Sequence, residues 1–263
     1  MRKQITRVPP EAWLNQHITP EMLRQMEELA LRRDMLTLLT YVRDNKVVGT
    51  QSTGNMPLKA VREVTACFVN PPVLEETIGD HTYRLRSETD IWPLYFLHVL
   101  AEVGKLLDVA PARRWRLTRS GEEFLNAPPV IQVLVLLSIW WYQVNWLVAY
   151  SFVGMGDALP PALNTIALAH LRALPVERAV AFEPFADELI AKAGLRWTSR
   201  DTTFHRSALH SAVEFMVINI LKNFGVLKVA YREEPLGLGT ISTLDTFELT
   251  PLGNVLLGAL SFM

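Results

Sequence analysis

The same local pattern occurs twice in this chain, half a chain apart, and it constrains the fold more than any other feature. In each copy an apolar helical stretch ends at a glycine, a short break follows, and a Leu-Thr dipeptide precedes another helical stretch. Glycine tolerates the left-handed conformation that ends a helix, and a threonine hydroxyl accepts hydrogen bonds from the first free amides of the next helix. The pattern therefore predicts helix, β-hairpin and helix in each half. The glycines are Gly104 and Gly225, and the dipeptides are Leu117-Thr118 and Leu249-Thr250.

Each threonine is followed three residues later by a glycine, Gly121 or Gly253. Glycine at such a place predicts a close approach of the helix to the hairpin. The second hairpin has the longer connection, because it carries the insert Glu233–Thr240. This insert is rich in glycine, so we expect a mobile turn there.

The composition fits a folded protein of one large or two small domains. Hydrophobic residues make up 49% of the 263 residues and charged residues 20%, which is enough for a sizeable core. The 26 Lys and Arg residues are balanced by 27 Asp and Glu residues. A chain with almost no net charge has no global attraction to nucleic acid, so any such binding requires a local basic patch.

Cys67 is the single cysteine, which excludes an intramolecular disulfide. Its neighbours are apolar and helical in pattern, and this context predicts a buried structural thiol. The polar N-terminus lacks the apolar core of a signal peptide. We therefore expect a cytoplasmic protein.

Residues 128–156 contain no charged side chain and are long enough to be considered as a membrane span. Polar residues are scattered around this stretch at helical spacing, and no Lys or Arg follows its C-terminal end closely. These features argue against a membrane location and favour a central helix buried between two flanking units. The polar residues are Gln132, Ser138, Gln143, Asn145 and Ser151.

These patterns together predict a mainly α protein with small β-hairpins, in which two units pack around a central apolar helix. We expect an N-terminal helical extension over residues 1–34, a first unit over 35–126, the central helix over 127–158 and a second unit over 159–263. Within the first unit, Lys46–Thr50 reads as a short strand and residues 73–90 as an irregular, polar segment.

The order of elements over residues 35–125 resembles a winged-helix domain, and residues 160–263 resemble a diverged copy of one. The stretch Thr53-Gly54-Asn55-Met56-Pro57, the tripeptide Arg86-Ser87-Glu88 and the Leu-Thr-x-x-Gly pattern also resemble an uncharacterised group of bacterial winged-helix proteins. The resemblance implies tandem winged-helix units. Because winged helices bind either DNA or proteins, it leaves the partner open.

In a winged helix that reads DNA, the helix before the hairpin enters the major groove and the hairpin touches phosphate. The first copy fits the first condition poorly, because its helix is apolar and follows Glu88 and Asp90, which would repel phosphate. Its hairpin carries arginines around Trp115 that suit phosphate contact, with a solvated hairpin edge as the alternative. The candidate contacts in this hairpin are Arg113, Arg114 and Arg116.

The second copy has a basic and polar start to its long helix, which is expected over residues 202–224. Thr203 and Arg206 are three residues apart and share a helix face, and Arg200 lies just before them. These three residues are the remaining candidate nucleic-acid contacts. An ordinary amphipathic helix with an exposed first turn is the alternative.

Few features indicate an enzyme, because no phosphate-binding loop, dinucleotide fingerprint or metalloprotease motif occurs. The pattern names no catalytic residue, metal ligand or cofactor. We expect a non-enzymatic interaction or regulatory protein with duplex DNA as a candidate partner, and a pure protein-interaction module is the alternative within this class. From another class, a small-molecule sensor or enzyme would use a pocket at the Trp-rich helix, lined by Trp141, Asn145 and Trp146, although packing also explains these aromatic residues.

Overall fold

The structure is a computed structural model that describes residue 9 and residues 11–78, 81–150, 159–198, 204–236 and 239–262. Its contacts divide the chain into an internal unit, Leu23–Val144, and a split unit formed by Met1–Met22 and Asn145–Met263. The fold is mainly helical with small antiparallel sheets, as the sequence predicts. Within the described ranges, no helix is both long enough and apolar enough to cross a membrane.

The internal unit begins within α2 and contains three helices with large buried side chains, α3, α5 and α7. The elements are α2 (Pro20–Glu28), α3 (Ala30–Asp44), α4 (Leu58–Thr65), β1 (Glu75–Ile78), β2 (His81–Arg84), the 3-10 turn η1 (Glu88–Asp90), α5 (Trp92–Val103), β3 (Leu107–Asp108), β4 (Arg116–Leu117), α6 (Arg119–Leu125) and α7 (Pro129–Tyr142).

The split unit combines helices with a three-stranded antiparallel sheet. Its elements are α1 (Glu11–His17), the 3-10 turn η2 (Trp146–Val148), α8 (Leu163–Arg172), β5 (Ala179–Ala181), α9 (Phe182–Ala193), α10 (His205–Val213), the π-helical turn η3 (Glu214–Ile218), α11 (Asn219–Asn223), β6 (Leu227–Leu236), β7 (Gly239–Leu249) and α12 (Pro251–Leu260).

The core of the internal unit lies where α3, α5 and α7 contact one another. Phe96 of α5 meets Trp140 of α7 edge-on, with ring centroids 5.3 Å apart, and both side chains are fully buried. Such pairs bury large apolar areas and add a favourable edge-to-face contact. An apolar helix is thus present as α7, but it ends at Tyr142 and is shorter than the expected span 127–158. Its tryptophans lie in the core of this unit.

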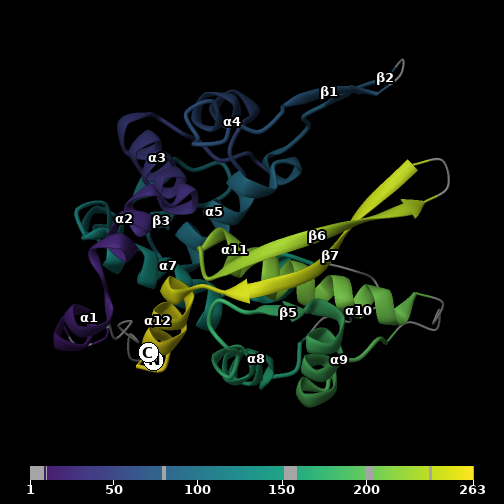
Figure 1. The fold of residues 1–263 in the computed structure, drawn as a ribbon. Helices are drawn as coiled ribbons and strands as arrows, with labels where there is room; N and C mark the ends of the chain where they lie inside the picture. Colours follow the sequence, from purple (N-terminus) through teal and green to yellow (C-terminus); the bar gives the residue numbers. More distant parts are fainter. Residues whose placement is uncertain are drawn as a thin grey trace. The chain divides into compact units, whose positions relative to one another are not determined.

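The sheet of the split unit has the strand order β5-β7-β6. Strands β6 and β7 form one long hairpin, which extends well past the short third strand β5 (Figure 1). The predicted mobile turn is therefore largely wrong, because Glu233 pairs with Ser242 and Pro235 with Thr240. The insert lengthens the hairpin, since its backbone groups find partners across the strand pair.

Both predicted joints between hairpin and helix are confirmed. The Thr118 hydroxyl accepts from the amide of Gly121 at 3.0 Å, and the Thr250 hydroxyl accepts from the amide of Gly253 at 2.8 Å. A β-carbon on Gly253 would lie 2.1 Å from the carbonyl oxygen of Val226. Helix α12 therefore approaches the backbone at the start of the hairpin, just before β6, so closely that only glycine fits.

The two glycines that end the preceding helices differ. Gly225 has φ of 68°, the left-handed value that the sequence predicts, whereas Gly104 has φ of −71° and the next residue, Lys105, takes the positive φ of 57°. The prediction for Gly104 was right about the residue but wrong about the cause. A β-carbon there would lie 2.3 Å from Cδ1 of Ile139 on α7, so a side chain at this position would require Ile139 to shift.

Three further expectations are corrected. Residues 73–90 are not simply irregular, because β1 and β2 pair as an antiparallel hairpin within them. Lys46–Thr50 forms no full strand and contributes a single bridge, Val48 to Arg114. Cys67 is exposed, because α4 ends at Thr65 and the cysteine lies on the irregular turn that follows.

Candidate nucleic-acid interface

The turn between β3 and β4 carries three of the predicted contact residues, and strand alternation determines where they point. Successive side chains of an extended strand point to opposite faces. Trp115 points inward and is 1% exposed, so its neighbours Arg114 and Arg116 are both turned outward and exposed. Arg113, at the end of the turn, is exposed as well. We call residues Leu107–Leu117 the arginine hairpin.

The segment before α4 completes this hairpin by pairing with its second arm. The amide of Gly49 donates to the carbonyl of Arg113 at 2.9 Å, and the amide of Trp115 donates to the carbonyl of Val47 at 2.9 Å. Val48 and Arg114 form the antiparallel bridge between these two bonds. The arginines therefore stand on backbone that is held on both sides.

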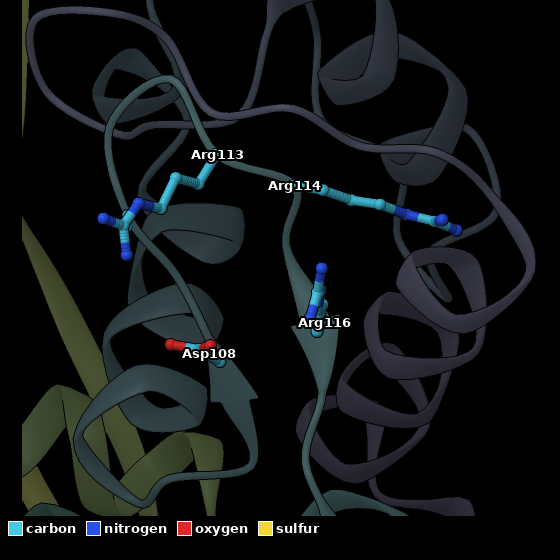
Figure 2. Close-up of a pocket in the computed structure, with 5 residues that line it drawn as sticks. Asp108, Arg113, Arg114 and Arg116 are labelled. Atoms are coloured by element: carbon cyan, nitrogen blue, oxygen red, sulfur yellow. The ribbon is translucent and has the colours of Figure 1, made fainter.

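A pocket of about 250 Å³ lies at the arginine hairpin. Its lining consists of Asp108, Ala110 and the three arginines. Figure 2 shows the Arg113 and Arg114 side chains extending to opposite sides of the turn, with Arg116 on β4 between them. Guanidinium groups spread in this way offer donors to several oxygen atoms of an extended anion.

The three guanidinium groups are unneutralised. Asp108 is the cross-strand neighbour of Arg116, but no ion pair joins them, and none of the three arginines has an ion-pair partner among the described residues. The next arginine along the chain behaves differently, because Arg119 pairs with Glu123 at 2.9 Å. The hairpin thus carries three arginines against one acid, Asp108, and has a local excess of positive charge on a chain that is almost neutral overall.

A buried polar network supports the hairpin from inside. Glu88 is 0% exposed, and its two carboxylate oxygens contact the amide of Met56 at 2.6 Å and Nδ1 of His98 at 2.7 Å. The His98 ring packs on Trp115 with centroids 4.4 Å apart, and the indole nitrogen of Trp115 donates to the carbonyl of Gly54 at 3.0 Å. One chain of contacts therefore joins three separate segments to the hairpin.

This network corrects the expectation that Glu88 presents an acidic face to phosphate. Its carboxylate is enclosed and fully engaged, so it is not available at the surface. Asp90 is exposed, and its carboxylate accepts from the amides of Arg86 and Ser87, which lowers the pKa of Asp90 below its usual range. For Asp90 a signal was present, because Ser87-x-x-Asp90 is a capping-box pattern and the structure contains that box. For Glu88 the sequence gives no sign of the partners, because Met56 and His98 lie in other segments.

The predicted contact residues of the second copy are either ion-paired or outside the described residues. Arg206 at the start of α10 pairs with Asp187 at 2.9 Å and with Glu183 at 3.4 Å, both on α9. Its hydrogen bond and that of His210 lower the pKa of Asp187 to about 2. Arg200 and Thr203 lie outside the described residues. Arg206 is therefore engaged within its own unit, in contrast to the three arginines of the hairpin.

The predicted pocket residues belong to both units. Trp141 is buried in the internal unit, whereas Asn145 and Trp146 lie in the split unit. The Asn145 side chain accepts from the amide of Leu147 at 3.1 Å and so caps the turn η2. No cluster of three or more metal-ligating side chains occurs in the described part of the chain.

Comparisons with protein-family models, with curated proteins and with solved structures find no match to this chain. The functional argument therefore rests on the site itself.

Proposed function

We propose that the chain is a non-enzymatic interaction or regulatory protein built on winged-helix-like units, and that its internal unit binds duplex DNA through the arginine hairpin. The observation that carries this proposal is the set of three exposed arginines at one pocket, none of which has an ion-pair partner in the described part of the chain. Phosphate oxygens are the partners that guanidinium groups bind best in extended anions. When the guanidinium groups neutralise DNA phosphates, counterions are released from the DNA, and this release supplies affinity even to a nearly neutral protein.

The order of elements in the internal unit supports the winged-helix comparison. Helix α3 is followed by the bridging segment at Val48, then by α4, α5, the arginine hairpin and α6, with the extra hairpin β1-β2 and the turn η1 inserted between α4 and α5. In this comparison α5 stands where a recognition helix would stand. Six of its twelve side chains are buried, all between Leu94 and Ala101, and the helix is largely apolar, so it offers few polar groups to base edges. We therefore propose binding that follows the phosphate backbone and tolerates different sequences.

The experiment is a titration of a fluorescent duplex with the protein over a range of salt concentrations. The Arg114→Ala/Arg116→Ala variant should bind more weakly, and the slope of log affinity against log salt should fall by about 0.9 for each phosphate contact removed. Arg43→Ala/Arg119→Ala is the matched control. It removes the same charge from two exposed arginines that are paired with Asp44 and Glu123.

The proposal requires that the control keeps more of the salt slope than the hairpin variant. Equal slopes in the two variants, or no salt-dependent binding by the wild-type protein, would overturn it. In that case an acidic protein surface becomes the partner to test. Weaker binding of such a surface by the Arg114→Ala/Arg116→Ala variant would show that the same two arginines bind it.

A further inference from the structure

The segment Thr50–Gly54 forms a closed turn beside the arginine hairpin, and we call it the polar turn. The amide of Gly54 donates to the carbonyl of Thr50 at 3.0 Å, and the amide of Thr50 donates to the carbonyl of Asn55 at 2.9 Å. Gly54 has φ of 79°, a value that suits glycine at the end of a turn. Backbone hydrogen bonds within the turn therefore hold its conformation.

The polar turn is also joined to the arginine hairpin. The amide of Ala112 donates to the carbonyl of Thr50 at 3.2 Å, and Trp115 donates to the carbonyl of Gly54. The two backbones approach so closely that a β-carbon on Gly54 would lie 3.1 Å from the nitrogen of Pro111. Three separate contacts thus fix the polar turn against the tip of the hairpin.

Two side chains at the tip of the polar turn are exposed and make no polar contact with the described residues. Gln51 and Ser52 are exposed and have no hydrogen bond or ion pair among the described residues. Thr53 is different, because its hydroxyl bonds to that of Thr50 at 2.8 Å and accepts from the amide of Asn55. An amide and a hydroxyl therefore stand free next to the arginines.

We propose that Gln51 and Ser52 form a second, uncharged contact with duplex DNA, so that the polar turn and the arginine hairpin bind one backbone together. This inference rests on the proposed function. Glutamine and serine side chains are common donors to phosphate oxygens, and they fix the register of a protein on the duplex. Because the turn is already closed and tied to the hairpin, few degrees of freedom are lost on binding.

The buried network gives this surface its fixed geometry. Glu88 holds the amide of Met56, two residues after the polar turn, and His98 connects that carboxylate to Trp115 of the hairpin. The same three side chains therefore link the polar turn to the arginine hairpin. The turn and the hairpin are held as one surface before any partner arrives.

Salt dependence separates the uncharged contact from the charged one. Removing a neutral donor releases no counterion, so the Gln51→Ala/Ser52→Ala variant should bind the duplex about tenfold more weakly with an unchanged salt slope. Gln16→Ala/Gln143→Ala removes two exposed glutamines elsewhere and serves as the control. Both substituted residues of the turn are exposed, so the variant should fold like the wild-type protein.

The outcomes distinguish the two proposals. If the arginine variant weakens binding while the turn variant binds like its control, the uncharged contact is overturned and the proposed function stands. A turn variant with a reduced salt slope would also overturn the inference, because the turn would then act only through the arginines. If the arginine variant binds like the wild-type protein, the proposed function fails first. Ser52→Asp adds a second check, since a carboxylate in contact with phosphate should weaken binding beyond the effect of Ser52→Ala.

Discussion

The carboxylate of Glu88 lies 2.7 Å from Nδ1 of His98, in a place where neither side chain reaches bulk solvent. The second oxygen of the same carboxylate accepts from the amide of Met56. A buried carboxylate is stable only when hydrogen bonds replace its lost hydration. Here the replacement comes from a helix and a loop at once. Because the His98 ring packs on Trp115, the same carboxylate is linked through His98 to the arginine hairpin.

Replacing Glu88 by alanine should therefore destabilise the internal unit strongly. The change leaves the Met56 amide and His98 Nδ1 buried without partners, and each such group costs about 1–3 kcal/mol in the free energy of unfolding. Urea unfolding followed by tryptophan fluorescence measures the loss. Glu88→Gln keeps a side chain that can bond both groups and should recover most of it. Glu102→Ala removes a half-exposed carboxylate 3.7 Å from the other nitrogen of His98, and an equal loss there would contradict this account.

The two glycines of α12 should respond oppositely to alanine. At Gly253 the new β-carbon would lie 2.1 Å from a backbone oxygen, so we expect a loss of about 1–3 kcal/mol or more from overpacking. At Gly258 it would lie 3.6 Å from the Trp13 ring, an ordinary contact, and the better helix propensity of alanine should add up to about 1 kcal/mol. Thermal unfolding of the two variants checks the sign of each change. A loss of the same size at both positions would show that the close approach at Gly253 is not the cause.

At acid pH the fold should lose the stabilisation that the ion pairs between α9 and α10 provide. The pKa of Asp187 is lowered to about 2, first by its hydrogen bond with Arg206 and then by that with His210. A lowered carboxyl pKa stabilises the fold above the ordinary value of 3.8, and this contribution disappears as the pH falls from there through about 2. Because the Asp187 side chain is half exposed, solvent screening keeps the effect on stability small.

Titration of the Asp187 carboxyl by NMR tests this directly. Arg206→Ala should move its pKa upward, toward the ordinary value. Lys192→Ala removes a neighbouring positive charge of α9 that pairs with Glu188 instead, and it should leave Asp187 almost unchanged. Equal shifts in both variants would mean that general charge, and not the Arg206 contact, sets the pKa.

Cys67 should react in the native protein. Its side chain is exposed on the turn after α4, although the sequence predicted a buried thiol. A thiol reagent such as Ellman's compound should modify one group per chain without denaturant, since access and thiolate fraction control the rate. Reaction only after unfolding would show that the thiol is enclosed in solution.

The local parts of this fold were predictable because they depend on neighbouring residues alone. The threonine caps at Thr118 and Thr250 and the alternation around Trp115 follow from short patterns in the sequence. The role of Gly104 was not predictable, because its constraint comes from Ile139, a residue of another helix. The burial of Glu88 was not predictable for the same reason, since its partners lie in other segments. The sequence therefore predicts the exposed arginines of the candidate site but not the buried contacts that support them.

The threonine and glycine of each joint also limit how the chain can change over generations. The hydroxyl of Thr250 accepts from the amide of Gly253 and donates to the carbonyl of Gly225, while the bare α-carbon of Gly253 lets the helix come near enough for both bonds. A substitution of either residue removes the contact that makes the other residue favourable. Mutation must therefore pass through a less stable intermediate to leave this arrangement, which is a physical reason for the same four-residue pattern to persist in both halves.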